Sequence, residues 1–336
     1  MKPLLNSTNR KRLVQVLGFA LIVLAIYAML AAIALATSFA LLQKGVVSDL
    51  PWISSIQKNL YMKATRRIWQ HQVDCVDFDD QLIYKPKDGA CQFSNAEFDT
   101  RLNFSAEGRF TGKKPAGIGI AILGDSHAMG WGVQDEETFA AELQKLAKRP
   151  VYNLAVSSYG TVRELLRLEK SGLLQKVDTV IIQYCENDLE ENTRGHIAGA
   201  DDNRRNFEKI TQEKSGSSAL LRTITKAYRY AFALPLRHGR AKAEKAKDFS
   251  SHYQPLMAAI DKYPGLRDKR VLIFYSNGGG RRFQAFPRGK DKLLPNVEFI
   301  DVNLDPGDFY RIDDHPTPSG HRKAARQLFT LLGDSK

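Results

Sequence analysis

The segment GIAILGDSH, residues 119–127, decides the fold class of this 336-residue chain. Its first five residues are small or apolar and predict a buried strand, and Gly124 then allows a sharp turn. In an open α/β sheet, ligands bind beyond the carboxyl ends of the strands, so Ser126 lies where a nucleophile is useful. A structural role is also open, in which Asp125 and Ser126 cap the helix that follows.

Further strand candidates follow at intervals, and helical patterns separate them. The segments Glu137–Lys148 and Val162–Leu174 have apolar residues at helical spacing. Strands that alternate with helices predict a three-layer α/β/α sandwich around a mostly parallel, five-stranded sheet. The five strand candidates are Ile118–Leu123, Val151–Leu154, Thr179–Tyr184, Val271–Tyr275 and Val297–Ile300.

An apolar run near the N-terminus predicts a membrane segment. Leu13–Leu42 contains no charged residue and is longer than the roughly 20 residues that span a bilayer as helix. Basic residues precede it, which predicts a cytoplasmic N-terminus and a periplasmic or extracytoplasmic domain. A cleaved signal peptide is the alternative, with Ala34-Leu35-Ala36 as its cleavage site. The run exceeds the usual apolar core of a signal peptide, which favours an uncleaved single-pass anchor in the inner membrane.

The chain therefore divides into four predicted parts. They are a cytoplasmic N-terminus (1–12), a transmembrane helix (13–42), an extracytoplasmic linker or N-terminal extension (43–115) and the α/β domain (116–334). A basic, helix-leaning insertion interrupts the domain at about 192–250. It is interpreted as a lid over the sheet, with contact to anionic headgroups or to an acidic polysaccharide as the alternative.

Composition and cysteine usage narrow the class of protein. Lys plus Arg number 49 and Asp plus Glu 37, a net charge of +12, which leaves nucleic acid open on charge alone. No nucleic-acid reading motif is present, and the predicted compartment also argues against that partner. Cys75 and Cys91 flank a short stretch that a disulfide would close in an oxidising compartment. Cys185 ends an apolar strand, which favours a buried side chain over a catalytic thiol.

Three further stretches follow predicted strands or precede the final helix, in a definite order. They contain Gly160, Asn187 and, in the segment DDHPTPSGH (313–321), His315. Together with Ser126, this set resembles the four motif blocks of the SGNH hydrolases, the GDSL-type esterase and lipase superfamily. The resemblance covers about residues 117–332 and implies the SGNH variant of a flavodoxin-like fold.

The resemblance implies a catalytic site of known type, for which the physical reasons are clear. Ser126 would be the nucleophile and His315 the base that accepts its proton. The family's usual position for the orienting carboxylate is occupied by Ile312, so Asp313 is the expected partner, with Asp314 open. The implied oxyanion hole consists of the backbone N–H groups of Ser126 and Gly160 and the side-chain amide of Asn187.

Other residues with suitable chemistry are weaker candidates. His127 is adjacent to Ser126 in sequence, which makes it a poor alternative base. Asp188 and Glu190 lack the His or Cys neighbours of a metal site, so no metal or cofactor is expected. The segment Ser276–Gly280 lacks the Lys and Ser or Thr of a phosphate loop.

These observations predict a membrane-anchored serine esterase that hydrolyses acyl esters, acetyl esters above all, on an extracytoplasmic carbohydrate. The alternative is an O-acyltransferase that passes the same acyl group to a cell-surface polysaccharide and that needs a membrane partner as acyl donor. A third hypothesis is a non-catalytic binding or assembly subunit on a hydrolase fold.

Overall fold

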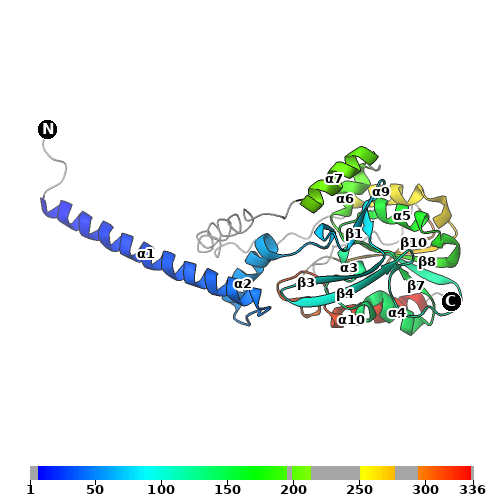
Figure 1. Ribbon diagram of the computed structural model, residues 1–336, viewed down its shortest axis with the longest axis horizontal. Coiled ribbons are helices and arrows are strands. Elements are labelled where there is room, and N and C mark those ends of the chain that lie inside the picture. Colours follow the sequence, from blue (N-terminus) through cyan, green and yellow to red (C-terminus); the bar gives the residue numbers. More distant parts are fainter. Residues whose placement is uncertain (1–6, 195–198, 213–249, 277–293, 334–336) are drawn as a thin grey trace. The chain divides into compact units, whose positions relative to one another are not determined.

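The computed structural model describes residues 7–194, 199–212, 250–276 and 294–333 (Figure 1). The described residues up to Thr65 form one compact unit, and those from Arg66 onward form another. Most of the predicted basic insertion and residues 277–280 of the glycine-rich segment lie outside the described residues.

The first unit consists of helices. α1 spans Ser7–Gln43, and the uncharged run lies within it. Among the described helices it is the one that is long and apolar enough to cross a membrane, over the 34 residues Arg10–Gln43. α2 (Pro51–Leu60) and a short π-helix (Tyr61–Thr65) follow.

The second unit is built on an eight-stranded sheet of order β10-β9-β8-β6-β7-β5-β4-β3. All five predicted strands are present and pair in parallel. Numbered along the chain, these five have the flavodoxin-like order 2-1-3-4-5, which confirms the α/β class. Their bounds are Gly119–Leu123 (β6), Val151–Asn153 (β7), Val177–Tyr184 (β8), Arg270–Tyr275 (β9) and Val297–Phe299 (β10).

The other three strands of the sheet come from the region expected to be a linker or extension. β3 (Gly89–Asn95), β4 (Phe98–Ser105) and β5 (Gly108–Arg109) are antiparallel, and β5 pairs with β7. The prediction of five strands, and of a domain that starts at residue 116, therefore differs from the structure. The cause is that alternate residues of β4 are buried, so this hairpin extends the sheet. A separate hairpin joins β1 (Val76–Asp79) and β2 (Ile83–Pro86).

Helices cover both faces of the sheet (Figure 1). The side chains of β6 alternate: Ile120 and Ile122 pack in one core, Ala121 and Leu123 in the other. Both faces of a parallel strand are thus buried, which explains the continuous apolar run in the sequence. The first core contains α4 (Phe139–Ala147) and α10 (Pro318–Gly333), and the second contains α5 (Thr161–Lys170) and α9 (Ser250–Asp261).

A disulfide joins Cys75 to Cys91, with their Cα atoms 5.3 Å apart. It links the residue before β1 to the middle of β3, so it crosslinks the two antiparallel hairpins. Cys185 follows β8 and is a buried free thiol.

Candidate active site

The turn after β6 places Ser126 at the carboxyl edge of the sheet. Gly124 has φ +146°, and a Cβ there would lie 2.7 Å from the Ala128 side chain, so the position requires glycine. Asp125 caps the short helix α3 (Ser126–Met129) by accepting the His127 N–H at 2.9 Å. Asp125 is thus the cap, and the Ser126 side chain has another partner.

That partner is His315, which lies 189 residues further along the chain. The Oγ atom of Ser126 is 2.7 Å from Nε2 of His315. The other ring nitrogen, Nδ1, is hydrogen-bonded to Oδ1 of Asp313, which is completely buried. The structure therefore brings Ser126, His315 and Asp313 together, and Asp313, rather than Asp314, bonds to the imidazole.

The protonation state of His315 suits a base. Burial lowers the pKa of His315 below its ordinary value of 6.5, and the neighbouring Asp313 carboxylate offsets part of this effect. The imidazole is therefore neutral at neutral pH. Its Nε2 can then accept the proton of the serine hydroxyl while Nδ1–H donates to the carboxylate.

Trp131, from the loop after α3, fixes this pair. Its indole stacks on the His315 ring, with ring centroids 4.6 Å apart and an angle of 11° between the planes. The indole N–H donates to Oδ2 of Asp313 at 3.2 Å. The two contacts restrict both members of the acid–base pair, because each residue can rotate only by breaking one of them.

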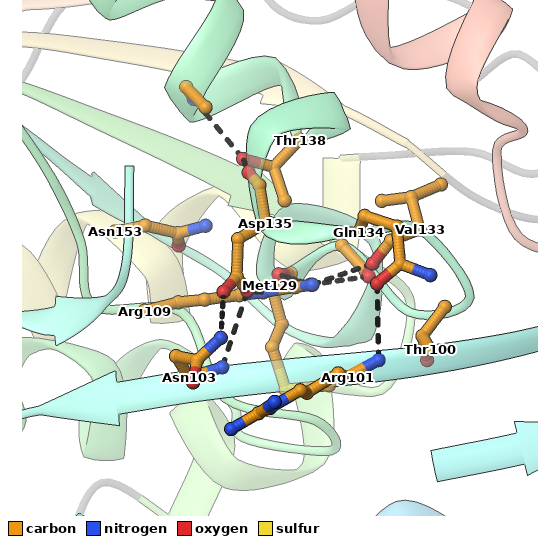
Figure 2. A network of polar contacts seen from close by, with 12 residues as sticks. Thr100, Arg101, Asn103, Arg109, Met129, Val133, Gln134, Asp135, Thr138 and Asn153 are labelled. Carbon is orange, nitrogen blue, oxygen red and sulfur yellow. Dashed lines mark hydrogen bonds and ion pairs between the residues drawn. The ribbon is translucent and has the colours of Figure 1, made fainter. Parts of the chain in front are cut away.

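The loop around Trp131 is held from the antiparallel part of the sheet (Figure 2). Arg109, on β5, is completely buried, and its guanidinium donates to the carbonyl groups of Met129 (2.8 Å), Gly130 (2.6 Å) and Val133 (2.6 Å). Its Nε atom also donates to Asp135 at 2.8 Å. The planar guanidinium has five N–H donors in fixed directions and makes these four hydrogen bonds at once, whereas a lysine ammonium has only three donors.

The loop that contains Asp313 is held from the turn between β3 and β4. The Glu97 carboxylate accepts the backbone N–H groups of Arg311, Ile312 and Asp313 at 2.8–2.9 Å. Burial raises the pKa of Glu97, and these three hydrogen bonds oppose the increase. Glu97 thus fixes the backbone from which Asp313 projects.

Arg66 is a further residue that the sequence analysis did not identify. Its Nη2 atom lies 3.2 Å from Nδ1 of His315, and its Nε atom lies 3.4 Å from Oδ2 of Asp313. It is separated from His315 by 249 residues of sequence, and no motif surrounds it.

The expected oxyanion donors are only partly available. Ser126 begins α3, so its backbone N–H has no acceptor within that helix. The Asn187 amide donates weakly to the Tyr159 carbonyl, at 3.4 Å, and retains a second N–H. The N–H of Gly160, however, donates to the Glu191 carboxylate at 3.1 Å. This differs from the prediction for Gly160, because Glu191 caps the N-terminal end of α5.

A cavity of about 530 Å³ opens beside Ser126. Both Asn187 and Gly160 line it, as does Trp131. The rest of the wall includes the charged side chains of Arg66, Asp125, Arg163, Glu190, Glu191 and Arg194. Five further lining side chains have amide or hydroxyl groups. These are Gln70, Ser157, Ser158, Asn203 and Asn206.

The two other histidines near the site are engaged elsewhere. Nδ1 of His127 lies 3.1 Å from the Ser276 hydroxyl, and burial lowers its pKa to about 4. His321 accepts the Phe139 N–H at 3.2 Å, and burial lowers its pKa to about 3. Neither imidazole bonds to Ser126 in these contacts.

The remaining candidates also have structural partners. Asp188 accepts the backbone N–H of Cys185 at 2.6 Å, and Glu190 pairs with Arg194. Burial raises the pKa of the Cys185 thiol, which opposes thiolate formation. Within the described ranges, no three His, Cys, Asp or Glu side chains form a group that would hold a metal ion.

Comparison with known proteins adds distant similarities. No model of a protein family matches the sequence, and no curated protein matches it. The chain is similar to the structure of a lipolytic protein of the G-D-S-L family from Veillonella parvula, with 11% identity, a TM-score of 0.33, and coverage of 65% of this chain and 99% of that one. It is also similar to the structure of an acetylxylan esterase from Geobacillus stearothermophilus, with 15% identity and a TM-score of 0.35. That match covers 66% of this chain and 97% of the esterase.

A two-domain esterase active on acetylated mannans is also similar, with 14% identity and a TM-score of 0.36. The match covers 65% of this chain and 49% of that one, so the chain spans about half the length of that esterase. The matched structures include members of the GDSL family, which the sequence motifs resemble.

Proposed function

We propose that this chain is a serine esterase that hydrolyses acyl esters. The observation that supports it most directly is the contact of 2.7 Å between Ser126 Oγ and His315 Nε2, with Asp313 on the other ring nitrogen. A serine hydroxyl is a poor nucleophile until a base accepts its proton, and this arrangement provides the base and its orienting carboxylate.

The mechanism follows from these contacts. As Ser126 Oγ bonds to the ester carbonyl carbon, its proton passes to His315 Nε2 and the C=O electron pair moves to the oxygen. The Ser126 N–H and the Asn187 amide stabilise that oxyanion. His315 then donates the proton to the departing alcohol, and water attacks the acyl-enzyme by the same route in reverse.

The proposed substrate is an acyl, above all an acetyl, ester of a carbohydrate. The wall of the cavity beside Ser126 contains charged side chains such as Arg163 and Glu191, together with the Trp131 ring. It is also lined with amide and hydroxyl groups. Such groups suit a ligand with many hydroxyl groups, because each can donate and accept hydrogen bonds. If a sugar hydroxyl replaced water as the acceptor, the same site would be an O-acyltransferase.

We further propose that the chain is anchored in the inner membrane with the catalytic unit outside the cytoplasm. Basic residues precede the apolar segment of α1, as in cytoplasmic flanks of membrane helices. The Cys75–Cys91 disulfide is consistent with an oxidising compartment. A membrane acyl donor would be the partner in the transferase alternative.

A fluorophosphonate probe tests the catalytic proposal. Wild-type protein should be labelled at Ser126 and hydrolyse an acetyl ester, whereas Ser126→Ala and His315→Ala should lose both, with turnover falling by about 10⁶. Ser105→Ala is the control, since Ser105 is exposed at the end of β4 and its hydroxyl contacts the Gly108 carbonyl. Hydrolysis undiminished in Ser126→Ala would disprove the assignment.

The same preparations distinguish hydrolysis from transfer. Release of free acetate in the presence of oligosaccharides supports the esterase, and recovery of the acyl group on the sugar supports the transferase. Absence of labelling in folded wild-type protein favours the non-catalytic subunit.

A further inference from the structure

Arg66 makes contacts with three members of the site at once. Its guanidinium carbon lies 4.9 Å from the centre of the Trp131 ring. Nη2 is 3.2 Å from the Asp313-bound nitrogen of His315, and Nε is 3.4 Å from Asp313. The Arg66 side chain is only 17% exposed, so these interactions are not screened as surface pairs are.

The Asp313 carboxylate needs such a partner. It is completely buried, and a buried carboxylate without an opposite charge is strongly destabilising. Its Oδ1 bonds to His315, which is neutral before the reaction, and its Oδ2 accepts the Trp131 N–H. Arg66 provides a permanent positive charge beside that second oxygen.

The same charge acts on the proton transfer. When His315 accepts the proton from Ser126 it becomes a cation, and the Arg66 guanidinium already lies within 4 Å of its ring. Two like charges at this distance repel, so the arginine opposes the charging that Asp313 favours. The charged or titratable groups that act on His315 are Asp313, Asp314 and Arg66, and its imidazole acts in turn on His127 and His321.

We propose that Arg66 is a positioning residue of the triad, which neutralises the Asp313 carboxylate in the resting state and keeps His315 unprotonated to lower pH. The proposal rests on the proposed function, since it assumes that His315 is the catalytic base. It means that the site operates in a more acidic medium than Asp313 and His315 alone would allow.

The titration of His315 tests this directly and requires no turnover. Hydrogen–deuterium exchange at the imidazole C2 position depends on ring protonation and can be followed by mass spectrometry in full-length protein in detergent micelles. The peptide fragment is chosen to separate His315 from His321. The variants are Arg66→Gln and Arg66→Met. Arg67→Gln is the control, since Arg67 is exposed and its backbone N–H and carbonyl bond to the Asn95 side chain.

The pH midpoint of the His315 exchange titration should rise by about one unit in Arg66→Gln and Arg66→Met, because a neighbouring positive charge is removed. It should stay at the wild-type value in Arg67→Gln. Circular dichroism shows which variants are folded, and a folded variant of either kind suffices. A His315 midpoint in folded Arg66→Gln or Arg66→Met equal to that of Arg67→Gln would overturn the proposal.

The ester assay on the same samples separates the two proposals. If the enzyme is active, the acidic limb of the pH profile of kcat/KM should shift to higher pH in the Arg66 variants, by the same amount as the midpoint of the exchange titration. A shifted midpoint in a protein without esterase activity would retain Arg66 as a charge partner of His315 and would reject the proposed function.

Discussion

In the parallel half of the sheet, the turns that follow β6 and β8 contain Ser126 and Asn187, the proposed nucleophile and the proposed oxyanion donor. In the antiparallel half, β5 and the β3–β4 turn provide Arg109 and Glu97, which contact backbone of the loops around Trp131 and Asp313. The parallel half thus positions the side chains of the candidate site, and the antiparallel half restrains the two loops that complete the site. A catalytic geometry depends on both, because a displaced imidazole loses its hydrogen bond to the serine.

The largest effect should come from the triad carboxylate. Asp313→Asn removes the acceptor that orients His315 and stabilises its cation, and kcat should fall by about 10⁴. Asp314→Asn is the matched control, since the structure joins Asp313 to the imidazole. Steady-state hydrolysis of an acetyl ester measures both, and an equal loss in the two variants would contradict the assignment.

The next effect tests the antiparallel half. Arg109→Met leaves three carbonyl groups and the Asp135 carboxylate without their buried cationic partner, which should cost about 3–5 kcal/mol in unfolding free energy. Arg101→Met, on the exposed face of β4, should change it by less than about 0.5 kcal/mol. Urea unfolding measures both variants.

If the antiparallel half restrains the loop around Trp131, Arg109→Met should also reduce esterase activity in the fraction of protein that remains folded. In that fraction the fluorophosphonate probe should still label Ser126 to the same final stoichiometry as in the wild type. Full kcat in that fraction would show that β5 stabilises the fold without restraining Trp131.

The smallest expected effect is the loss of folding stability at acid pH that two buried histidines cause. His321 and His127 are buried with pKa values lowered to about 3 and about 4, below the unfolded value of about 6.5. The unfolded chain therefore binds more protons below pH 6.5, and stability is lost as pH falls from there toward those values. Each histidine contributes a slope of about 1.4 kcal/mol per pH unit.

His321→Asn keeps a hydrogen-bond acceptor for Phe139 but does not titrate in this range. The unfolding free energy of this variant should therefore fall less than that of the wild-type protein between pH 6 and pH 5. The two slopes should differ by about 1.4 kcal/mol per pH unit, the contribution of one histidine. Parallel profiles for the two proteins would show that His321 does not contribute.

The sequence predicted the parallel half because its strands are buried on both faces and appear as continuous apolar runs. It also predicted Ser126, Asp313 and His315, since these lie in short motifs. The antiparallel half was missed, although Phe98, Thr100, Leu102 and Phe104 show the alternation of a half-buried strand. That pattern was the available signal.

The supporting residues could not be predicted in the same way. Arg66, Arg109 and Glu97 act through contacts between segments distant in sequence, and a single arginine or glutamate on a polar stretch is ordinary for an exposed surface. The engagement of Gly160 by Glu191 is of the same kind, because it depends on how α6 (Asp188–Arg194) packs against the start of α5.

The stacking of Trp131 on His315 also means that tryptophan fluorescence can monitor the site. An imidazolium against an indole face is a cation–π pair, and protonated imidazole quenches indole fluorescence more strongly than the neutral ring. The chain has three tryptophans, so replacing Trp52 and Trp69 by phenylalanine would leave one tryptophan, in contact with His315, the proposed base. Its emission would then report in real time when His315 gains and releases a proton.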